Sequence, residues 1–195
     1  MEDTKRAMGE ILEHIQSLQK NVKGHEVEQF IDALLKSKRV FVVGAGRSGL
    51  VAKAFVMRLM HLGMDVYVIG ETITPALRAK DTLLAISGSG ETELIVETAK
   101  IGKKIGAKII AVTTYPKSPL AKLADVVVTL PGRKEVAAIA DYMKRELFGE
   151  YAPLAPLGTL FEVGVMVFLD GVIAAMMVKL GKKEEDLRAR HATIE

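Results

Sequence analysis

The 195-residue chain contains no cysteine. This absence excludes a disulfide framework, a thiolate nucleophile and a cysteine-ligated metal site. An excess of one charge is also lacking, because 27 Lys and Arg residues against 24 Asp and Glu residues leave a formal net charge of only +3. Both signs are mixed along the surface segments, so the chain lacks the one-sided basic face of a nucleic-acid-binding protein. We therefore expect no nucleic-acid partner.

Long uninterrupted hydrophobic runs are lacking as well. The most apolar segment, residues 163–178, is interrupted by Asp170 and is shorter than the ~20 residues that a membrane-spanning helix needs. It predicts a buried helix, and we expect no membrane partner. The printed sequence shows no signal peptide, so the expected location is the cytoplasm. Asparagine occurs once, at Asn21, while Lys, Arg and Glu are plentiful, a balance that resembles that of thermophilic proteins.

Helical and strand patterns alternate regularly along the chain. Apolar residues at helical spacing, with Gly24 as a break, predict two amphipathic helices before residue 38. Short aliphatic runs without polar alternation follow, as expected for strands buried on both faces of a sheet. These runs are 40–43, 66–69, 82–86, 108–112 and 126–130. The helical stretches between them are long enough to cross over, so the pattern predicts an α/β fold with a parallel sheet covered on both faces.

A glycine-rich loop, GAGRSG at residues 44–49, follows the first of these runs. It satisfies the pattern G-x-G-x-x-G between a predicted strand and a predicted helix, which by itself indicates dinucleotide binding. Glu71, just past the second predicted strand, stands where a dinucleotide-binding fold has its ribose-binding carboxylate. A dinucleotide-binding oxidoreductase is therefore one alternative.

A second loop, SGSGET, follows the third run and favours a phosphate. Its members are Ser87, Gly88, Ser89, Gly90, Glu91 and Thr92. The amino end of a helix binds an anion without any cation, the three hydroxyl groups can donate further hydrogen bonds, and the two glycines let the backbone close around phosphate oxygens. Helix capping by Ser89 or Glu91 alone is the simpler alternative. Three hydroxyl groups in six residues exceed what a cap needs, so we interpret the loop as an anion site.

Both loops and three other stretches resemble the sugar isomerase (SIS) domain family, and within it the 6-phospho-3-hexuloisomerases. The matching stretches are VFVVGAGRSGLVAKAFVMRLMHLG from residue 40, VIGETITPAL from 68, LLAISGSGET from 83, PLGTLFE at 156–162 and LRARHATIE from 187. The resemblance implies one SIS-type three-layer α-β-α sandwich over residues 1–195. It also implies a five-stranded parallel sheet, and residues 1–37 form an N-terminal helical extension. Residues 134–149 do not align with the family's usual loop.

The resemblance implies an isomerase that interconverts a 3-hexulose 6-phosphate and fructose 6-phosphate through an enediol, with no cofactor and no metal. Glu162 is the candidate base, because a charge near the start of a strongly apolar helix is costly without a purpose. Favourable interaction with the helix dipole is the alternative role for Glu162. His191 is the candidate for proton transfer near neutral pH, with a merely solvated side chain as its alternative.

The candidate sugar-phosphate contacts are Gly46, Arg47 and Ser48 of the first loop, together with residues 87–92 of the second. Arg47 could meet a sugar hydroxyl or the phosphate, and a surface ion pair is equally plausible. The family likeness points to a homotetramer with sites completed across subunits. A sugar-phosphate-binding regulatory module without catalysis also stays open, as does the pathway, which could be formaldehyde fixation or ribulose 5-phosphate supply.

Overall fold

The computed structural model describes residues 1–132 and 154–193. The helices are α1 (Glu2–Asn21), α2 (Gly24–Leu35), α3 (Gly46–His61), α4 (Glu93–Ile105), α5 (Pro119–Leu123), α7 (Thr159–Leu180) and α8 (Glu184–Arg188). The strands are β1 (Val40–Gly44), β2 (Val66–Val68), β3 (Thr82–Ile86), β4 (Lys108–Thr113) and β5 (Val126–Thr129). All the predicted strands are present. Gly24, the predicted break, begins α2.

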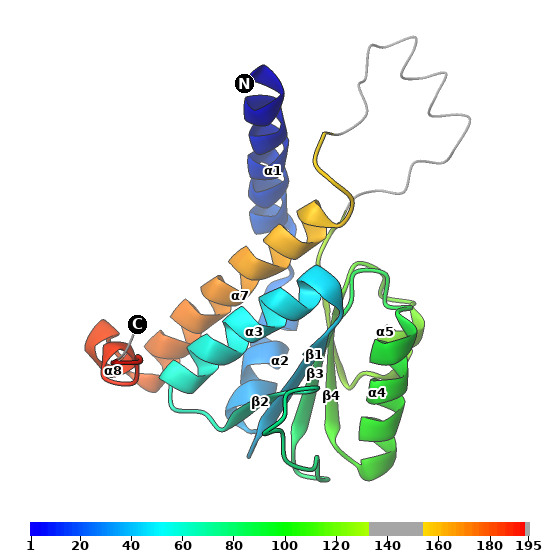
Figure 1. Cartoon of the computed structure of the whole chain (residues 1–195). Coiled ribbons are helices and arrows are strands. Elements are labelled where there is room, and N and C mark those ends of the chain that lie inside the picture. Colours follow the sequence, from blue (N-terminus) through cyan, green and yellow to red (C-terminus); the bar gives the residue numbers. More distant parts are fainter. Residues whose placement is uncertain (133–153, 194–195) are drawn as a thin grey trace.

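The strands form one five-stranded sheet in the order β2-β1-β3-β4-β5, and every neighbouring pair is parallel. Helices α2, α3 and α7 cover one face, while α4 and α5 cover the other (Figure 1). The predicted three-layer α-β-α sandwich is therefore confirmed. The assignment of residues 1–195 to a single domain with an extension over 1–37 stays a prediction.

Both faces of the sheet are buried, which explains why the strands read as continuous apolar runs. Along β1, Val40 and Val42 belong to the core beneath α3 and α7, whereas Phe41 and Val43 belong to the core beneath α4 and α5. Each strand residue thus contacts a helical layer on one side or the other. A polar side chain in the middle of these strands would lose its hydration on either face.

Helix α7 contacts α3, α1 and α2. Within the described residues it is the one helix long and apolar enough to cross a membrane by length and composition, and 39% of that window is buried in the fold. Its inner side carries core residues such as Val165 and Phe168, while Val167 is 45% and Val178 is 83% exposed. The prediction of a buried helix thus holds for one face. Helix α1 extends away from the body of the molecule (Figure 1), and Leu18 is its buried residue.

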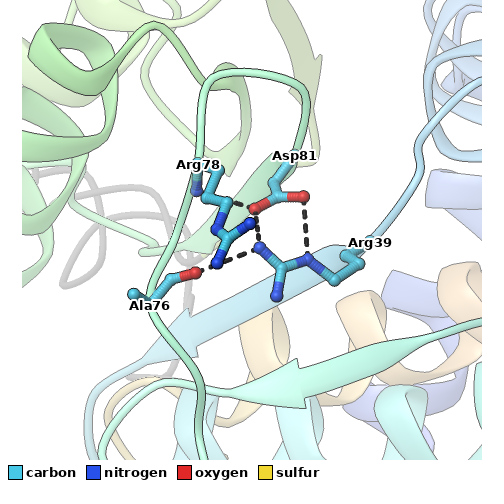
Figure 2. Close-up of polar contacts among 4 residues, drawn as sticks. All are labelled: Arg39, Ala76, Arg78 and Asp81. Atoms are coloured by element: carbon cyan, nitrogen blue, oxygen red, sulfur yellow. Dashed lines mark hydrogen bonds and ion pairs between the residues drawn. The ribbon is translucent and has the colours of Figure 1, made fainter.

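An ion pair lies at the end of the sheet where the strands begin. Arg39 precedes β1 and Asp81 precedes β3, and the first residues of these strands lie opposite each other. The guanidinium donates to both carboxylate oxygens, at 3.0 Å from Nε and 2.6 Å from Nη2, and also reaches the Ala76 carbonyl (Figure 2). The backbone amide of Arg78 donates to Asp81 at 2.7 Å. The pair closes the loop that leads into β3.

Burial of the Asp81 side chain, which is 2% exposed, would raise the pKa of its carboxyl. The hydrogen bonds from Arg39 and from the Arg78 amide outweigh this effect and hold the pKa of Asp81 below its ordinary value. Because the folded-state pKa is the lower one, the pair contributes its full stability above the unfolded pKa of about 3.9. That contribution is lost as the pH falls through the folded-state pKa.

Replacing Asp81 by Asn leaves a nearly buried guanidinium without its counter-charge. We expect the Asp81→Asn variant to lose about 3 kcal/mol of unfolding free energy near neutral pH, the low end for a broken buried pair, because Arg39 keeps its hydrogen bond to the Ala76 carbonyl. The difference from the wild type should begin to shrink below about pH 3.9, where the unfolded carboxyl protonates, and should disappear as the pH falls through the lower folded-state pKa of Asp81. Guanidinium chloride denaturation near pH 7 and below pH 4 measures the unfolding free energy of the variant and of the wild type. Asp3→Asn, whose side chain is 85% exposed, is the matched control, and an equal effect in it would contradict the prediction.

Candidate functional site

The two glycine-rich loops lie side by side because their strands are neighbours in register. Gly44 at the end of β1 pairs with Ile86 at the end of β3, so the loops 44–49 and 87–92 leave the sheet at the same level. The chain places β2 on one side of β1 and β3 on the other. This is the switch point of an open α/β sheet, where ligands bind beyond the carboxyl ends of the strands.

In the first loop, the backbone around Gly44 packs closely against the backbone of Ser48 and Gly49. A side-chain carbon on Gly44 would lie 2.7 Å from the carbonyl oxygen of Ser48, and one on Gly49 would lie 2.7 Å from the carbonyl oxygen of Gly44. Glu71, the supposed ribose ligand, pairs with Lys53 of α3 at 2.5 Å. Both features of the dinucleotide alternative therefore have local structural explanations that require no nucleotide.

In the second loop, side-chain hydroxyls hold the backbone in shape. Ser87 is buried, and its Oγ accepts a hydrogen bond from the amide of Gly90 at 3.1 Å and lies 3.2 Å from Oγ1 of Thr92. Oγ of Ser89 accepts from the amide of Glu91 at 3.2 Å. An accepting hydroxyl keeps its own proton for donation to a ligand. The hydroxyls thus shape the loop and can also serve an anion.

The loop leads into α4 without a side-chain cap. Thr92 occupies the N-cap position, and its side chain makes no capping hydrogen bond within the described part of the chain. The helix starts at Glu93, directly after this loop. The simpler interpretation, that Ser89 or Glu91 only caps this helix, thus has no support from the observed hydrogen bonds. The amino end of α4 stays available to an anion.

The loop after β4 donates hydrogen bonds to the backbone of the second loop. The sequence analysis did not predict these contacts. The amide of Thr114 donates to the carbonyl of Gly88 at 3.1 Å, and Oγ1 of Thr113 lies 3.2 Å from the same oxygen. Ser118 caps α5 by accepting from the Ala121 amide at 3.3 Å. The signal was present as three Ser or Thr residues in the stretch TTYPKSP, which directly follows a predicted strand.

Helix α7 brings Glu162 to this edge of the sheet. Phe161, in the first turn of α7, is buried and packs against Gly88, where an added side-chain carbon would lie 3.0 Å from its Cδ1. The neighbouring Glu162 accepts a hydrogen bond through Oε2 from Nε of Arg47 in the first loop. The Glu162 side chain is 14% exposed and that of Arg47 is 60% exposed. The start of α7 therefore touches both loops, and the predicted residues Arg47, Glu162 and 87–92 come together.

His191 lies at the other end of the molecule from Glu162. Its ring packs against that of His61, the last residue of α3, with 5.2 Å between the ring centroids. Arg47 sits in the first turn of α3, and a 16-residue helix is ~24 Å long. Both histidines line a cavity of about 360 Å³ beside α8. Within one chain His191 is thus not brought to Glu162, so its predicted role requires a neighbouring subunit.

Residues 134–149, which do not align with the usual loop of the family, fall outside the described residues. Among residues 1–132 and 154–193, no three His, Asp or Glu side chains gather as a metal site would require. Gly46 and Ser48 lie in the first turn of α3, beside Arg47.

A family model for the SIS domain matches residues 33–147. The chain belongs to the SIS domain family. This SIS domain is 36% identical to a 3-hexulose-6-phosphate isomerase of Bacillus subtilis, over 98% of the chain and 99% of the relative. It is 43% identical to the enzyme of the same name from Mycobacterium gastri, over 83% of the chain and 76% of the relative.

A solved structure agrees with these similarities. A protein of Methanococcus jannaschii, for which the crystal structure infers a function as 3-hexulose-6-phosphate isomerase, superposes on this SIS domain with a TM-score of 0.77. The two are 32% identical, and the match covers 100% of both chains. The likeness therefore extends beyond the loops to the whole architecture.

The second loop depends on Gly90, whose φ is +65° and whose added side-chain carbon would lie 2.1 Å from Oγ of Ser118. We expect Gly90→Ala to lower the melting temperature by several degrees and to weaken fructose 6-phosphate binding at least about tenfold, because the loop must open. Calorimetry measures the melting temperature, and titration with fructose 6-phosphate measures the binding affinity.

The matched control for this prediction is Gly171→Ala in α7. Apart from its chain neighbours and the adjacent backbone of α7, no atom of the described residues lies within 4 Å of the added carbon there. A helix-interior alanine should stabilise the protein by about 0.5–1 kcal/mol. Wild-type melting and binding in Gly90→Ala would refute the assigned role of the second loop.

Proposed function

We propose that this SIS domain is an isomerase that interconverts 3-hexulose 6-phosphate and fructose 6-phosphate. The observation that carries the proposal is the nearly buried carboxylate of Glu162, which is paired with Arg47 of the first loop. The preceding residue, Phe161, packs on Gly88 of the second loop, the loop that suits a phosphate. The relatives named 3-hexulose-6-phosphate isomerase support the choice of substrate. The ribulose monophosphate pathway and formaldehyde assimilation follow from that name as part of the proposal.

In this proposal the phosphate binds at residues 87–92 and the amino end of α4. The backbone amides and the hydroxyls of Ser87, Ser89 and Thr92 supply donors without a lysine. Gly46, Arg47 and Ser48 approach the sugar from the first loop. Glu162 removes the proton from C2 to form an enediol and returns a proton to C3, which is general acid–base catalysis by one carboxyl group. His191 is the candidate for moving the proton between the oxygens at C2 and C3.

The proposal includes a homotetramer in which His191 enters the site of a neighbouring subunit. Apolar side chains on α1 and α7 are exposed in the single chain, as an assembled oligomer would explain. They include Met8, Leu12, Val167 and Val178. Location in the cytoplasm and origin in a thermophile stay predictions beside it.

The function is tested by proton NMR with each phosphosugar in deuterated water. The wild type should convert one sugar into the other and exchange the C3 proton of fructose 6-phosphate, because the removed proton passes through a solvent-exchangeable carboxyl group. A protein that binds the sugar without conversion or exchange would refute catalysis and favour a regulatory module.

Replacing the base tests the role of Glu162. We expect Glu162→Gln to bind fructose 6-phosphate within a few-fold of the wild type and to lose at least about 100-fold in kcat, the usual scale for a lost general base. Glu97→Gln on α4, which removes an exposed carboxylate paired with Lys100, is the matched control and should keep full activity. Near-normal kcat in Glu162→Gln would remove this residue from the mechanism.

Subunit complementation tests the role of His191. His191→Ala and Glu162→Gln should each be nearly inactive alone. Their co-expressed mixture should regain activity, because hybrid oligomers contain some sites with both native residues. Co-expression of Glu162→Gln with the double variant provides the control and should restore nothing. No recovery in the first mixture would contradict a site shared between subunits.

A further inference from the structure

We propose that Arg47 is a catalytic residue of this isomerase. Its Nε donates a hydrogen bond to the base, Glu162. Its terminal amino groups donate to the substrate oxygen on which negative charge develops. The inference rests on the proposed function. It goes further by giving Arg47 a part in the chemical step, in addition to any part in binding.

The geometry of the pair suits this double role. Nε of Arg47 donates to Oε2 of Glu162, and the other carboxylate oxygen, Oε1, lies over Gly158 at the start of α7. One oxygen of the base is thus oriented by the guanidinium and the second is the candidate proton acceptor. The carboxylate is the buried partner and the guanidinium is the exposed one. A guanidinium carries five N–H donors, so its exposed part retains donors for a ligand.

The distribution of charge leaves Arg47 available for the reacting atoms. The second loop, residues 87–92, contains no cation, and the amino end of α4 with its hydroxyls can bind the phosphate alone. Arg47 belongs to the neighbouring loop and faces the base. Its positive charge therefore lies where the proton moves, beside rather than within the anion site.

The chemical step moves negative charge from one neighbour of Arg47 to the other. Glu162 takes the proton from C2, the C–H electron pair forms the C2–C3 double bond, and the carbonyl electrons at C3 pass to its oxygen. A proton passes from the oxygen at C2 to the oxygen at C3, and Glu162 then returns its proton to C3 as the C2 carbonyl forms. No oxidant or reductant is needed.

The Arg47 guanidinium, placed between the Glu162 carboxylate and the substrate oxygen, has an anionic partner throughout this transfer. It pairs with the carboxylate before the step and with the enediolate oxygen after it. The interaction with the substrate oxygen strengthens as charge develops, which is the condition for lowering the barrier. Partial burial of the carboxylate increases the effect relative to open water.

The test compares Arg47→Met and Arg47→Lys with Lys53→Met, all assayed by proton NMR. Lys53 lies on the same helix, and its side chain is 55% exposed and paired with Glu71, so it controls for the loss of an α3 ion pair. We expect Arg47→Met to lower kcat by about 10²–10³, the cost of removing an oxyanion donor, with KM changed only a few-fold. Arg47→Lys should retain more activity, and Lys53→Met should match the wild type.

Chemical rescue provides a readout that a structural role would not change. Millimolar guanidinium chloride should raise the kcat of Arg47→Ala about tenfold or more, while equal sodium chloride should not. Melting temperatures of all variants establish that they are folded.

Several outcomes would overturn the inference. A raised KM with unchanged kcat in Arg47→Met would make Arg47 a ground-state binding residue. Equal kcat losses in Lys53→Met, or absence of rescue, would assign the effect to structure. A wild type without isomerase activity would refute the proposed function and the inference with it. An active wild type with an unimpaired Arg47→Met refutes the inference alone.

Discussion

The backbone hydrogen bonds between β1 and β3 fix where both glycine-rich loops begin. Since Gly44 lies opposite Ile86, the two loops leave the sheet at one level, and the helices that follow them, α3 and α4, cover opposite faces of the sheet. A shift of register would move every inward side chain of the strand to the other face. The apolar residues on both faces therefore fix the register of the strands, and the register fixes where the two loops begin.

The start of α7 closes the site over these loops. Phe161 anchors the helix on Gly88, and the next residue, Glu162, reaches Arg47 of the other loop. The buried ring and the ion pair lie one residue apart, so packing energy positions the group that is costly to bury. The opposite edge of the sheet is closed by Arg39 and Asp81 (Figure 2). The ion pair thus lies where the strands begin, and the candidate site lies where they end.

Much of the fold could be predicted from the sequence because it follows from local patterns. Aliphatic runs predicted the five strands with boundaries within one residue, and helical spacing with the break at Gly24 predicted the first two helices. The loop 87–92 was predicted as an anion site from its hydroxyl groups and its place before a helix. Its observed internal hydrogen bonds, such as that from Gly90 to Ser87, show that the same hydroxyls also build the loop.

What the sequence by itself determined is therefore the set of elements, their parallel arrangement and the residue types at the strand ends, since each depends on neighbours along the chain. Tertiary structure alone decided the partner of Glu162, because Arg47 is 115 residues away. It also decided that one face of α7 stays exposed and that His191 lies at the far end of α3. Such contacts depend on how whole helices pack on the sheet, and no local pattern encodes that packing.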